Sequence, residues 1–425
     1  MTAPDPSASP TPPSPLEGPS LLPLLSSRRI LICVGSGGVG KTTTSATLAL
    51  LAAITLGRRV LVLTIDPARR LADALGVQAL GHDIQRVSDD KLDAVARRRG
   101  MVRKPGGSLS AMMLDQKRAF DEIVQRYAKN DGVRTRIFQN SIYQQISASL
   151  AGSHEYAAMS KLYDLAQASP APYDLIVLDT PPTENALDFL DAPDRISQAI
   201  DSPALQWFIK PYLQAGSWSL RLVGVGGAVV LRGLSRFVGS QFLQQMAEFF
   251  VEFSEVTGGF RERAQKVRSL LRQPDVAFVL VCSPEQLSIE EALYFHNRLR
   301  KADMPLGGIV VNRVHTPGPK LPDGFADSLH AQPDLRGFLP EDLRRFSDDL
   351  IRTYDEEQVL AAADAAAIAD LRRQVAGPQG GTPQASSASA AGPSLPLCRV
   401  PIFDSDIHDA EGIALISAYL VPIQS

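Results

Sequence analysis

The sequence predicts an α/β fold in which a doubly wound, mostly parallel sheet carries a helical insertion. Three observations lead to this prediction. Short apolar runs rich in β-branched residues alternate with segments of helical periodicity. A glycine-rich loop joins the first apolar run directly to a helix. A segment rich in aromatic side chains, about 187–272, then separates the third apolar run from the fourth.

Size and composition exclude several classes of protein. With 425 residues, 44% of them apolar and 21% charged, the chain has an ordinary globular composition. The formal net charge of -3 forces no basic face, so no nucleic-acid partner is expected. Three cysteines are too few for a disulfide scaffold and suit a reducing compartment. Without a long apolar run or a signal-peptide pattern, we expect a cytoplasmic protein with no integral membrane segment.

Proline marks two stretches that we expect to lie outside the packed domain. Residues 1–27 hold 8 of the 31 prolines, and residues 374–397 hold another 4. Both stretches are also rich in Ser and Ala, and such compositions bury too little apolar surface to order a chain. The first is therefore predicted to be a disordered tail and the second a low-complexity linker. One domain remains over 28–373, completed by a strand, loop and helix within 398–425.

The first predicted strand, residues 30–34, leads into a phosphate-binding loop. The following residues match the pattern GxxxxGK[ST] and open a helix over 43–56, which Gly57 ends. Backbone N–H groups of such a loop cradle phosphates, the lysine reaches the β- and γ-phosphates, and the next hydroxyl ligates Mg²⁺. This pattern specifies the sheet as one of the P-loop NTPase type. The predicted nucleotide-binding residues of the loop are Gly35, Ser36, Gly37, Gly38, Val39, Gly40, Lys41, Thr42 and Thr43.

Two acidic residues follow the next two predicted strands. Asp66 follows the strand 59–65, and Asp179 follows the strand 173–178. Ligands of parallel sheets bind at the carboxyl ends of the strands. We expect Asp179 to hold Mg²⁺ through a water together with Thr42, and Asp66 to orient the attacking water, with Lys41 as the second catalytic residue. The alternative for each carboxylate is a helix cap or a turn, because Asp-Pro is a common turn pair.

Later segments add candidates for recognition of the base. Strands are predicted over 276–282 and 309–311, and the second ends at Asn312. An amide at that strand end can read the adenine edge, and it can equally be a turn residue. Both interpretations stay open on the sequence alone.

With these residues in place, the chain resembles the ArsA family, which includes the arsenite-pump ATPase and the tail-anchored-protein targeting ATPase. The family's first switch is matched by Asp66-Pro67-Ala68 and its second by Asp179-Thr180-Pro181-Pro182-Thr183. Residues 281–285 and 310–312 are similar to later family strands. The C-terminal loop against adenine is matched by residues 400–403, which adds Pro401, Ile402 and Phe403 as nucleotide contacts.

The resemblance implies a dimer that opens and closes as ATP is hydrolysed with Mg²⁺, and points to bacterial ArsA-like ATPases of unassigned role. One departure concerns the charge of the loop. Ser36 stands where the wider group has a signature lysine that reaches the partner's phosphates. Three explanations compete: a heterodimer with a lysine-bearing paralogue, which we favour, replacement by Arg69 or Arg70, or weak hydrolysis. In addition, switch two ends in Glu184-Asn185 rather than Gly-His.

The cysteines also depart from the known members of the family. No CxxC pair is present, so the zinc that clamps the targeting ATPase dimer has no ligands. Arsenite needs three convergent thiols, whereas Cys33 and Cys282 lie inside predicted buried strands. We therefore expect structural cysteines and no resident metal other than Mg²⁺.

Helices are predicted over about 110–170 and within 187–272. In the targeting ATPase a helical subdomain at this place holds an apolar client helix, so a client helix is one interpretation of the aromatic residues and core packing is the other. The functional hypotheses are a targeting or chaperone-like ATPase, a weakly hydrolysing regulatory subunit, and a MinD- or ParA-like positioning ATPase. The last would need a membrane anchor or basic face, for which the cluster Arg97–Arg99, Arg103 and Lys104 is a minor candidate.

Overall fold

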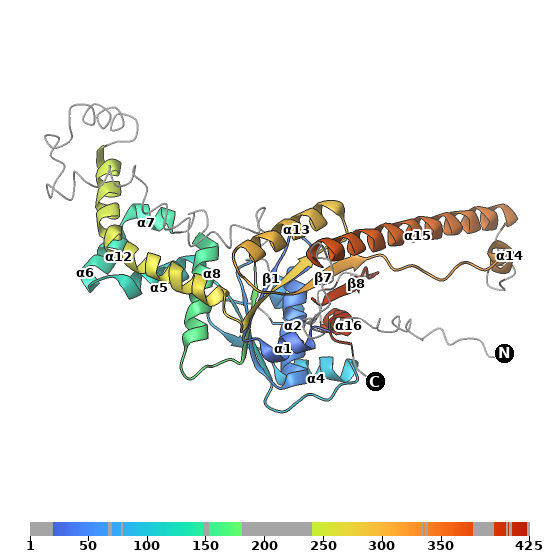
Figure 1. Ribbon diagram of the computed structural model, residues 1–425, viewed down its shortest axis with the longest axis horizontal. Coiled ribbons are helices and arrows are strands. Elements are labelled where there is room, and N and C mark those ends of the chain that lie inside the picture. The colour runs from blue at the N-terminus through green and yellow to red at the C-terminus, as the bar shows by residue number, and fades with distance from the viewer. Residues whose placement is uncertain are drawn as a thin grey trace, which may run out of the picture.

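One eight-stranded sheet forms the centre of the protein (Figure 1). The computed structural model describes residues 20–66, 70–77, 80–147, 153–180, 240–330, 332, 335, 339–376, 395–404, 407 and 410–422. Within them the strand order is β3-β4-β2-β5-β1-β6-β7-β8, and only the pair β3–β4 is antiparallel. The predicted α/β class with a mostly parallel sheet is confirmed.

The strands are short and largely apolar. All five predicted strands occur, and β1 and β6 are buried along their whole length. Their bounds are β1 Ile30–Val34, β2 Arg59–Thr64, β3 Gln85–Arg86, β4 Ser108–Met113, β5 Leu175–Asp179, β6 Val276–Cys282, β7 Leu306–Val314 and β8 Leu397–Pro401.

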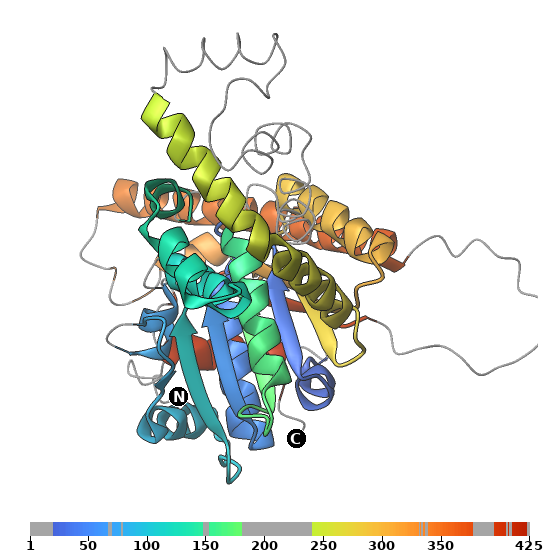
Figure 2. The ribbon, with the colours of Figure 1, turned by 90° about the vertical axis from the view of Figure 1, so that its left-hand side faces the viewer.

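Helices cover both faces of the sheet (Figure 2). Alternate residues of β1 point to opposite faces, so Ile30, Ile32 and Val34 join one core cluster while Leu31 and Cys33 join the other. The first cluster packs against α5–α8, α12, α13 and α15, and the second against α1–α4 and α16. Their bounds are α1 Leu22–Ser27, α2 Lys41–Leu56, α3 Arg70–Leu75, α4 Asp89–Arg98, α5 Gln116–Tyr127, α6 Asp131–Gln139, α7 Ser141–Ile146, α8 Ser153–Gln167, α12 Ser240–Leu271, α13 Gln286–Lys301, α14 Phe325–His330, α15 Pro340–Ala376 and α16 Ala410–Leu420.

The predicted tail is too long at its inner end. Leu22–Ser27 form the short helix α1, in which Leu25 is 0% exposed, and Leu21 before it is equally buried. The backbone N–H of Leu21 donates to the carbonyl of Leu420, so the chain entry is tied to the C-terminal helix α16. The four leucines within 21–25 bury enough surface to dock, despite Pro23 and the prolines before them. The domain therefore begins before residue 28.

The start of the first helical region was also predicted wrongly. Residues 108–113 form β4, which pairs in parallel with β2 from Arg59↔Ser108 to Thr64↔Met113. Helix α5 begins only at Gln116, after Asp115 caps it by accepting the N–H of Arg118. The run Ser-Leu-Ser-Ala-Met-Met has no β-branched residue, so its local preference gave no strand signal.

A layer of helices, which includes α5, α8 and α12, lies over one face of the sheet (Figure 2). Its centre is a group of aromatic rings, in which the Tyr156 and Phe260 rings stack at 5.7 Å and Phe120 lies 5.7 Å from Phe260. These three side chains are at most 2% exposed, so they are core. The part of the 187–272 insertion up to residue 239 lies outside the described residues, as do the predicted linker residues 377–394.

Candidate nucleotide-binding site

The phosphate-binding loop connects β1 to α2, and its glycines are required by their surroundings. A Cβ atom on Gly35 would lie 1.9 Å from the carbonyl oxygen of Val281, which belongs to the neighbouring strand β6. Gly40 has a φ of 93° and a Cβ there would lie 2.3 Å from Nδ2 of Asn312. The loop thus keeps its backbone close to two neighbouring strands, in the strand–loop–helix context that cradles phosphates.

Lys41 opens α2 and bends back over the loop. Its Nζ donates to the carbonyl of Ser36 at 2.6 Å, and the residue is 5% exposed. Burial lowers the pKa of Lys41, and the nearby Asp179 and Asp66 oppose that effect. An anion on the loop would stabilise this buried ammonium further, which is what a phosphate group supplies.

Asp179 ends β5 and is 0% exposed. One of its oxygens, Oδ2, accepts hydrogen bonds from Thr42 Oγ1 and from Thr64 Oγ1, both at 2.9 Å. Burial raises the pKa of Asp179 to about 6, against the lowering effect of these two hydrogen bonds. A buried carboxylate beside a hydroxyl is an oxygen set that suits Mg²⁺, so Thr42 and Asp179 fit the predicted metal site.

Asp66 follows β2 at the same edge of the sheet. Its backbone N–H donates to Thr64 Oγ1 at 3.2 Å, and its side chain is 11% exposed. The Asp66 Oδ2 atom lies 3.8 Å from Nη1 of Arg70, whose side chain is 63% exposed. Arg70 is therefore a cation beside the predicted water-orienting carboxylate. Arg69, the other proposed replacement for the missing lysine, lies outside the described residues.

Ser36 contacts the chain itself rather than projecting alone from the loop. Its Oγ lies 3.2 Å from Oγ of Ser288, which also accepts the N–H of Ser283 at 3.0 Å. Ser288 belongs to the first turn of α13, so the loop is joined to that helix by a neutral contact. At this position the protein has no charge to present to a partner.

The predicted base-binding residues gather at the ends of β7 and β8. Asn312 donates from Nδ2 to the carbonyl of Val39 at 2.9 Å, so its amide braces the phosphate-binding loop. Pro401 ends β8, and the N–H of Ile402 donates to the carbonyl of Val314. The Phe403 ring meets the Tyr419 ring edge-on at 6.1 Å. Contact of these residues with adenine stays a prediction.

Sequence reasoning missed Thr64 and Ser288. Both are hydroxyls that contact predicted site residues far away along the chain, at separations of 115 and 252 residues. The one available signal for Thr64 was a lone polar residue near the end of an apolar strand, two positions before Asp66.

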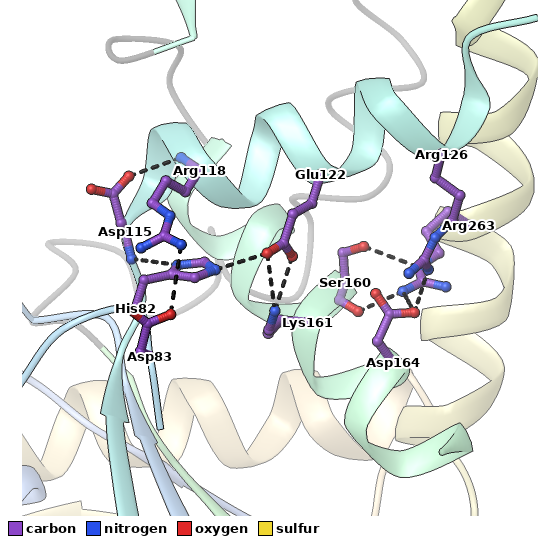
Figure 3. A network of polar contacts seen from close by, with 10 residues as sticks. All are labelled: His82, Asp83, Asp115, Arg118, Glu122, Arg126, Ser160, Lys161, Asp164 and Arg263. Carbon is purple, nitrogen blue, oxygen red and sulfur yellow. Dashed lines mark hydrogen bonds and ion pairs between the residues drawn. The ribbon is translucent and has the colours of Figure 1, made fainter. Parts of the chain in front are cut away.

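A polar network joins the segment after Asp66 to the helical layer (Figure 3). The N–H of Asp115 donates to Nδ1 of His82 at 3.2 Å, so the ring proton lies on Nε2 and is donated to Glu122 at 2.9 Å. Glu122 also accepts from Lys161 of α8 at 2.9 Å. Burial raises the pKa of Glu122, but the hydrogen bonds from Lys161 and His82 outweigh it and hold that pKa below its ordinary value.

A second group of polar contacts, one turn or less along α8, joins that helix to α12 and α5. Arg263 is 4% exposed, donates to Ser160 Oγ at 2.9 Å and pairs with Asp164, both residues of α8. Arg126 of α5 pairs with the same Asp164 (Figure 3). The three helices of the layer are therefore linked by ions as well as by aromatic rings.

Comparison with known proteins decides the family. The model of the ArsA family, described as anion-transporting ATPase, matches residues 28–320. The chain belongs to the anion-transporting ATPase family. It is therefore an ATP-binding ATPase of the ArsA type, as the motifs predict.

Several curated relatives are similar over most of their length. The chain is 28% identical to ATPase GET3 of Podospora anserina over 303 residues, which is 71% of this chain and 78% of that one. It is 27% identical over 345 residues to ATPase get3 of Neurospora crassa, with 80% and 87% covered. It is 25% identical over 348 residues to ATPase ASNA1 homolog 2 of Paramecium tetraurelia, with 81% and 88% covered.

All three cysteines lie in the interior of the protein. Cys33, Cys282 and Cys398 are buried, and burial raises the pKa of each thiol to about 12. Among the described residues, no three His, Cys, Asp or Glu side chains lie together so as to hold a metal ion. Within the same ranges no helix combines the length and the apolar character needed to cross a membrane.

Proposed function

We propose that this protein hydrolyses ATP with Mg²⁺ and that the cycle switches a dimer which acts on a client or partner protein, as in a cytoplasmic bacterial branch of the ArsA-type ATPases. The observation that carries the proposal is the buried contact of Thr42 with Asp179 beside Lys41. Hydrolysis of a phosphoanhydride requires a site for Mg²⁺, a lysine that binds the phosphates and a glycine-rich loop around them. Thr42 with Asp179, Lys41 and the loop after β1 would supply these three parts.

Each residue has a defined role in this proposal. Thr42 and Asp179 would hold the metal ion, which neutralises charge on the phosphates when bound. Lys41 binds the transferred phosphoryl group with its ammonium. Asp66 orients the attacking water through its carboxylate, which Arg70 approaches from the solvent side. Asn312 keeps the loop in shape by its bond to Val39.

Phosphate release from Mg²⁺-ATP by the purified chain tests the proposal. Lys41→Ala should abolish binding and turnover, whereas Asp66→Asn should keep nucleotide binding and lose hydrolysis about a hundredfold. Lys320 is an exposed residue of the loop after β7, so Lys320→Ala serves as the control. This variant should change neither nucleotide binding nor hydrolysis. Full activity of both site variants would contradict the proposal.

A regulatory subunit is the second candidate, and the Ser36–Ser288 contact favours it. A neutral hydroxyl held within the chain supplies no cation to a partner's phosphates, so a homodimer would lack one charge at each site. Cross-interface cations of this kind raise rates by roughly 10³–10⁵ in comparable enzymes. In this second candidate function, the chain forms a heterodimer with a paralogue that has the lysine.

Turnover alone and in a mixture with that paralogue separates the two candidates. We expect slow hydrolysis alone and faster hydrolysis in the mixture, and we expect Ser36→Lys to raise the rate of the single chain. Arg70→Ala tests the other source of charge. If Ser36→Lys and Arg70→Ala both leave turnover unchanged, the idea that a charge is missing at this position fails.

The proposed client is an apolar helix of another protein. Among the described residues, aromatic side chains of α5, α8 and α12 such as Phe120, Tyr156 and Phe260 are core, and the rest of the predicted insertion up to residue 239 lies outside the described residues. The positioning alternative is disfavoured by the basic cluster, because Arg103 pairs with Asp89 and Asp93, and Arg99 donates to the carbonyl of Val421. These arginines hold α4 in place instead of forming a free basic face.

A further inference from the structure

Thr64 carries a buried hydroxyl that joins the Asp179 carboxylate to the backbone of Asp66. It is the last residue of β2 and is 1% exposed. In the parallel ladder it is the direct neighbour of Asp179 on β5. The sheet register, rather than a loop, therefore fixes the distance between the Thr64 side chain and the Asp179 carboxylate.

The direction of its hydrogen bonds is settled by its neighbours. The N–H of Asp66 donates to Thr64 Oγ1 at 3.2 Å, and a backbone amide can only donate. Asp179 Oδ2 lies 2.9 Å from the same oxygen, so the single hydroxyl proton is donated to the carboxylate. A chain of bonds thus runs from the amide of Asp66 through Thr64 to Asp179, and such chains strengthen one another where water is excluded.

Thr42 and Thr64 donate to the same oxygen of Asp179 but differ in what else they do. Thr42 is the second residue of α2, directly after the phosphate-binding loop, and its hydroxyl is the group that this kind of site gives to the metal. Thr64 lies in a strand and its oxygen already accepts from Asp66, so its proton stays with Asp179.

We propose that Thr64 is a positioning residue that orients Asp179 for the metal ion and ties this carboxylate to the backbone of Asp66. The inference rests on the proposed function of the site. Through Thr64, the Asp179 carboxylate is linked to Asp66, the first residue of the first switch. Movement of Asp66 would therefore alter the hydrogen bonding of Asp179. Thr64 is uncharged, so it acts on Asp179 only through the hydrogen bond of its hydroxyl.

Four variants separate this role from a purely structural one. Thr64→Val removes the hydroxyl and keeps the shape, and Thr64→Ser keeps the hydroxyl. Thr55→Val is the control, because the half-buried Thr55 also donates a hydroxyl hydrogen bond, to the carbonyl of Leu51, but at the far end of α2. Thr64→Ala is a second way to delete the hydroxyl if the valine variant does not fold.

Calorimetric titration with a non-hydrolysable ATP analogue, in Mg²⁺ and in EDTA, gives the decisive comparison. Loss of a hydrogen bond to a charged group predicts about tenfold weaker binding for Thr64→Val in Mg²⁺, with affinity in EDTA unchanged. Thr64→Ser and Thr55→Val should match the wild type in both conditions. Phosphate release should show a lower kcat for Thr64→Val and recovery in Thr64→Ser.

Other outcomes overturn the inference. Equal loss of affinity in Mg²⁺ and in EDTA would mean that Thr64 only supports the fold. Failure of Thr64→Ser to recover, or wild-type behaviour of Thr64→Val and Thr64→Ala, would show that the hydroxyl does not position Asp179. If the wild-type chain itself does not bind the analogue with Mg²⁺, the proposed function fails, which is a separate result.

Discussion

The carboxyl edge of the sheet and the helical layer are held together by different forces. At the sheet edge, Thr64 and Asp179 contact each other inside a parallel ladder, and the buried Lys41 lies near Asp179. In the layer of α5, α8 and α12, stacked rings such as Tyr156 and Phe260 carry the packing, and ion pairs surround them.

Because of this difference, we expect substitutions in the two regions to have different effects. Uncharged changes at the sheet edge, such as Thr64→Val, should alter nucleotide chemistry with modest effects on folding, because little apolar surface is involved. Changes in the layer should alter folding, because its centre is apolar and closely packed. The His82–Glu122–Lys161 network lies between the two regions and is where they meet (Figure 3).

Phe260→Ala should have the largest effect on stability. The ring is 0% exposed and lies between Phe120, Tyr156 and Phe253. Removing a buried phenylalanine side chain costs about 3–5 kcal/mol of unfolding free energy. Urea unfolding measures the loss, and affinity for the Mg²⁺-bound ATP analogue per folded molecule should not change. A large loss of affinity with normal stability would contradict the division of the two regions.

Asp179→Asn should stabilise the metal-free and nucleotide-free protein in a pH-dependent way. The pKa of Asp179 is raised from 3.8 to about 6, so the folded state binds more protons than the unfolded state between these values. The wild type therefore loses stability as pH rises through this window, by about 3 kcal/mol in total, and the variant does not.

Urea unfolding at pH 5, 6 and 7.5 in EDTA measures this trend. The advantage of Asp179→Asn over the wild type should grow with pH across the series. An advantage that stays constant would mean that the buried carboxylate is not destabilised by its surroundings. Binding of Mg²⁺-nucleotide should be weakened in the same variant, since a metal-holding oxygen is lost.

Two adjacent glycines of α12 should respond in opposite directions. A Cβ on Gly259 would lie 2.2 Å from the Tyr127 ring, whereas a Cβ on Gly258 meets nothing within 4 Å. Gly259→Ala should cost about 1–3 kcal/mol because α12 must shift from α5. Gly258→Ala should gain up to about 1 kcal/mol from helix propensity. Equal melting temperatures of the two variants would show that α12 and α5 do not pack so closely.

Lys161→Met should have the smallest effect on stability. Its Nζ lies 2.9 Å from Glu122 Oε2, whose side chain is 42% exposed, and pairs of this exposure contribute up to about 1 kcal/mol. If the His82–Glu122–Lys161 network connects the two regions, Lys161→Met should still change the ATP concentration that gives half-maximal turnover. Lys266→Met removes the exposed pair with Glu262 on α12 and is the control, which should leave both melting temperature and turnover unchanged.

Local patterns made part of this structure predictable. The strands 30–34 and 276–282 and the stop at Gly57 follow from short apolar runs and a left-handed glycine with φ 69°. β4 and α1 were not predictable in this way, because Ser-Leu-Ser-Ala-Met-Met lacks strand propensity and α1 lies beside prolines. Burial against distant elements decides both.

The same contrast holds within the site. Lys41, Thr42 and Asp179 could be predicted as site residues because the loop motif and the strand ends have fixed spacing, and in the structure the three lie close together. The roles of Thr64 and Ser288, and the contact of Asn312 with Val39, depend on which strands become neighbours in the sheet. One sequence does not reveal that register.

Hydrogen–deuterium exchange with and without a non-hydrolysable Mg²⁺-ATP analogue tests the central claim most directly. Amides of residues 36–43 and the end of β2 should become protected, because the phosphates and the metal would lie there. A smaller change should appear in α8 and α12 through Lys161 and Arg263. Unchanged exchange at residues 36–43 at saturating nucleotide would contradict the account.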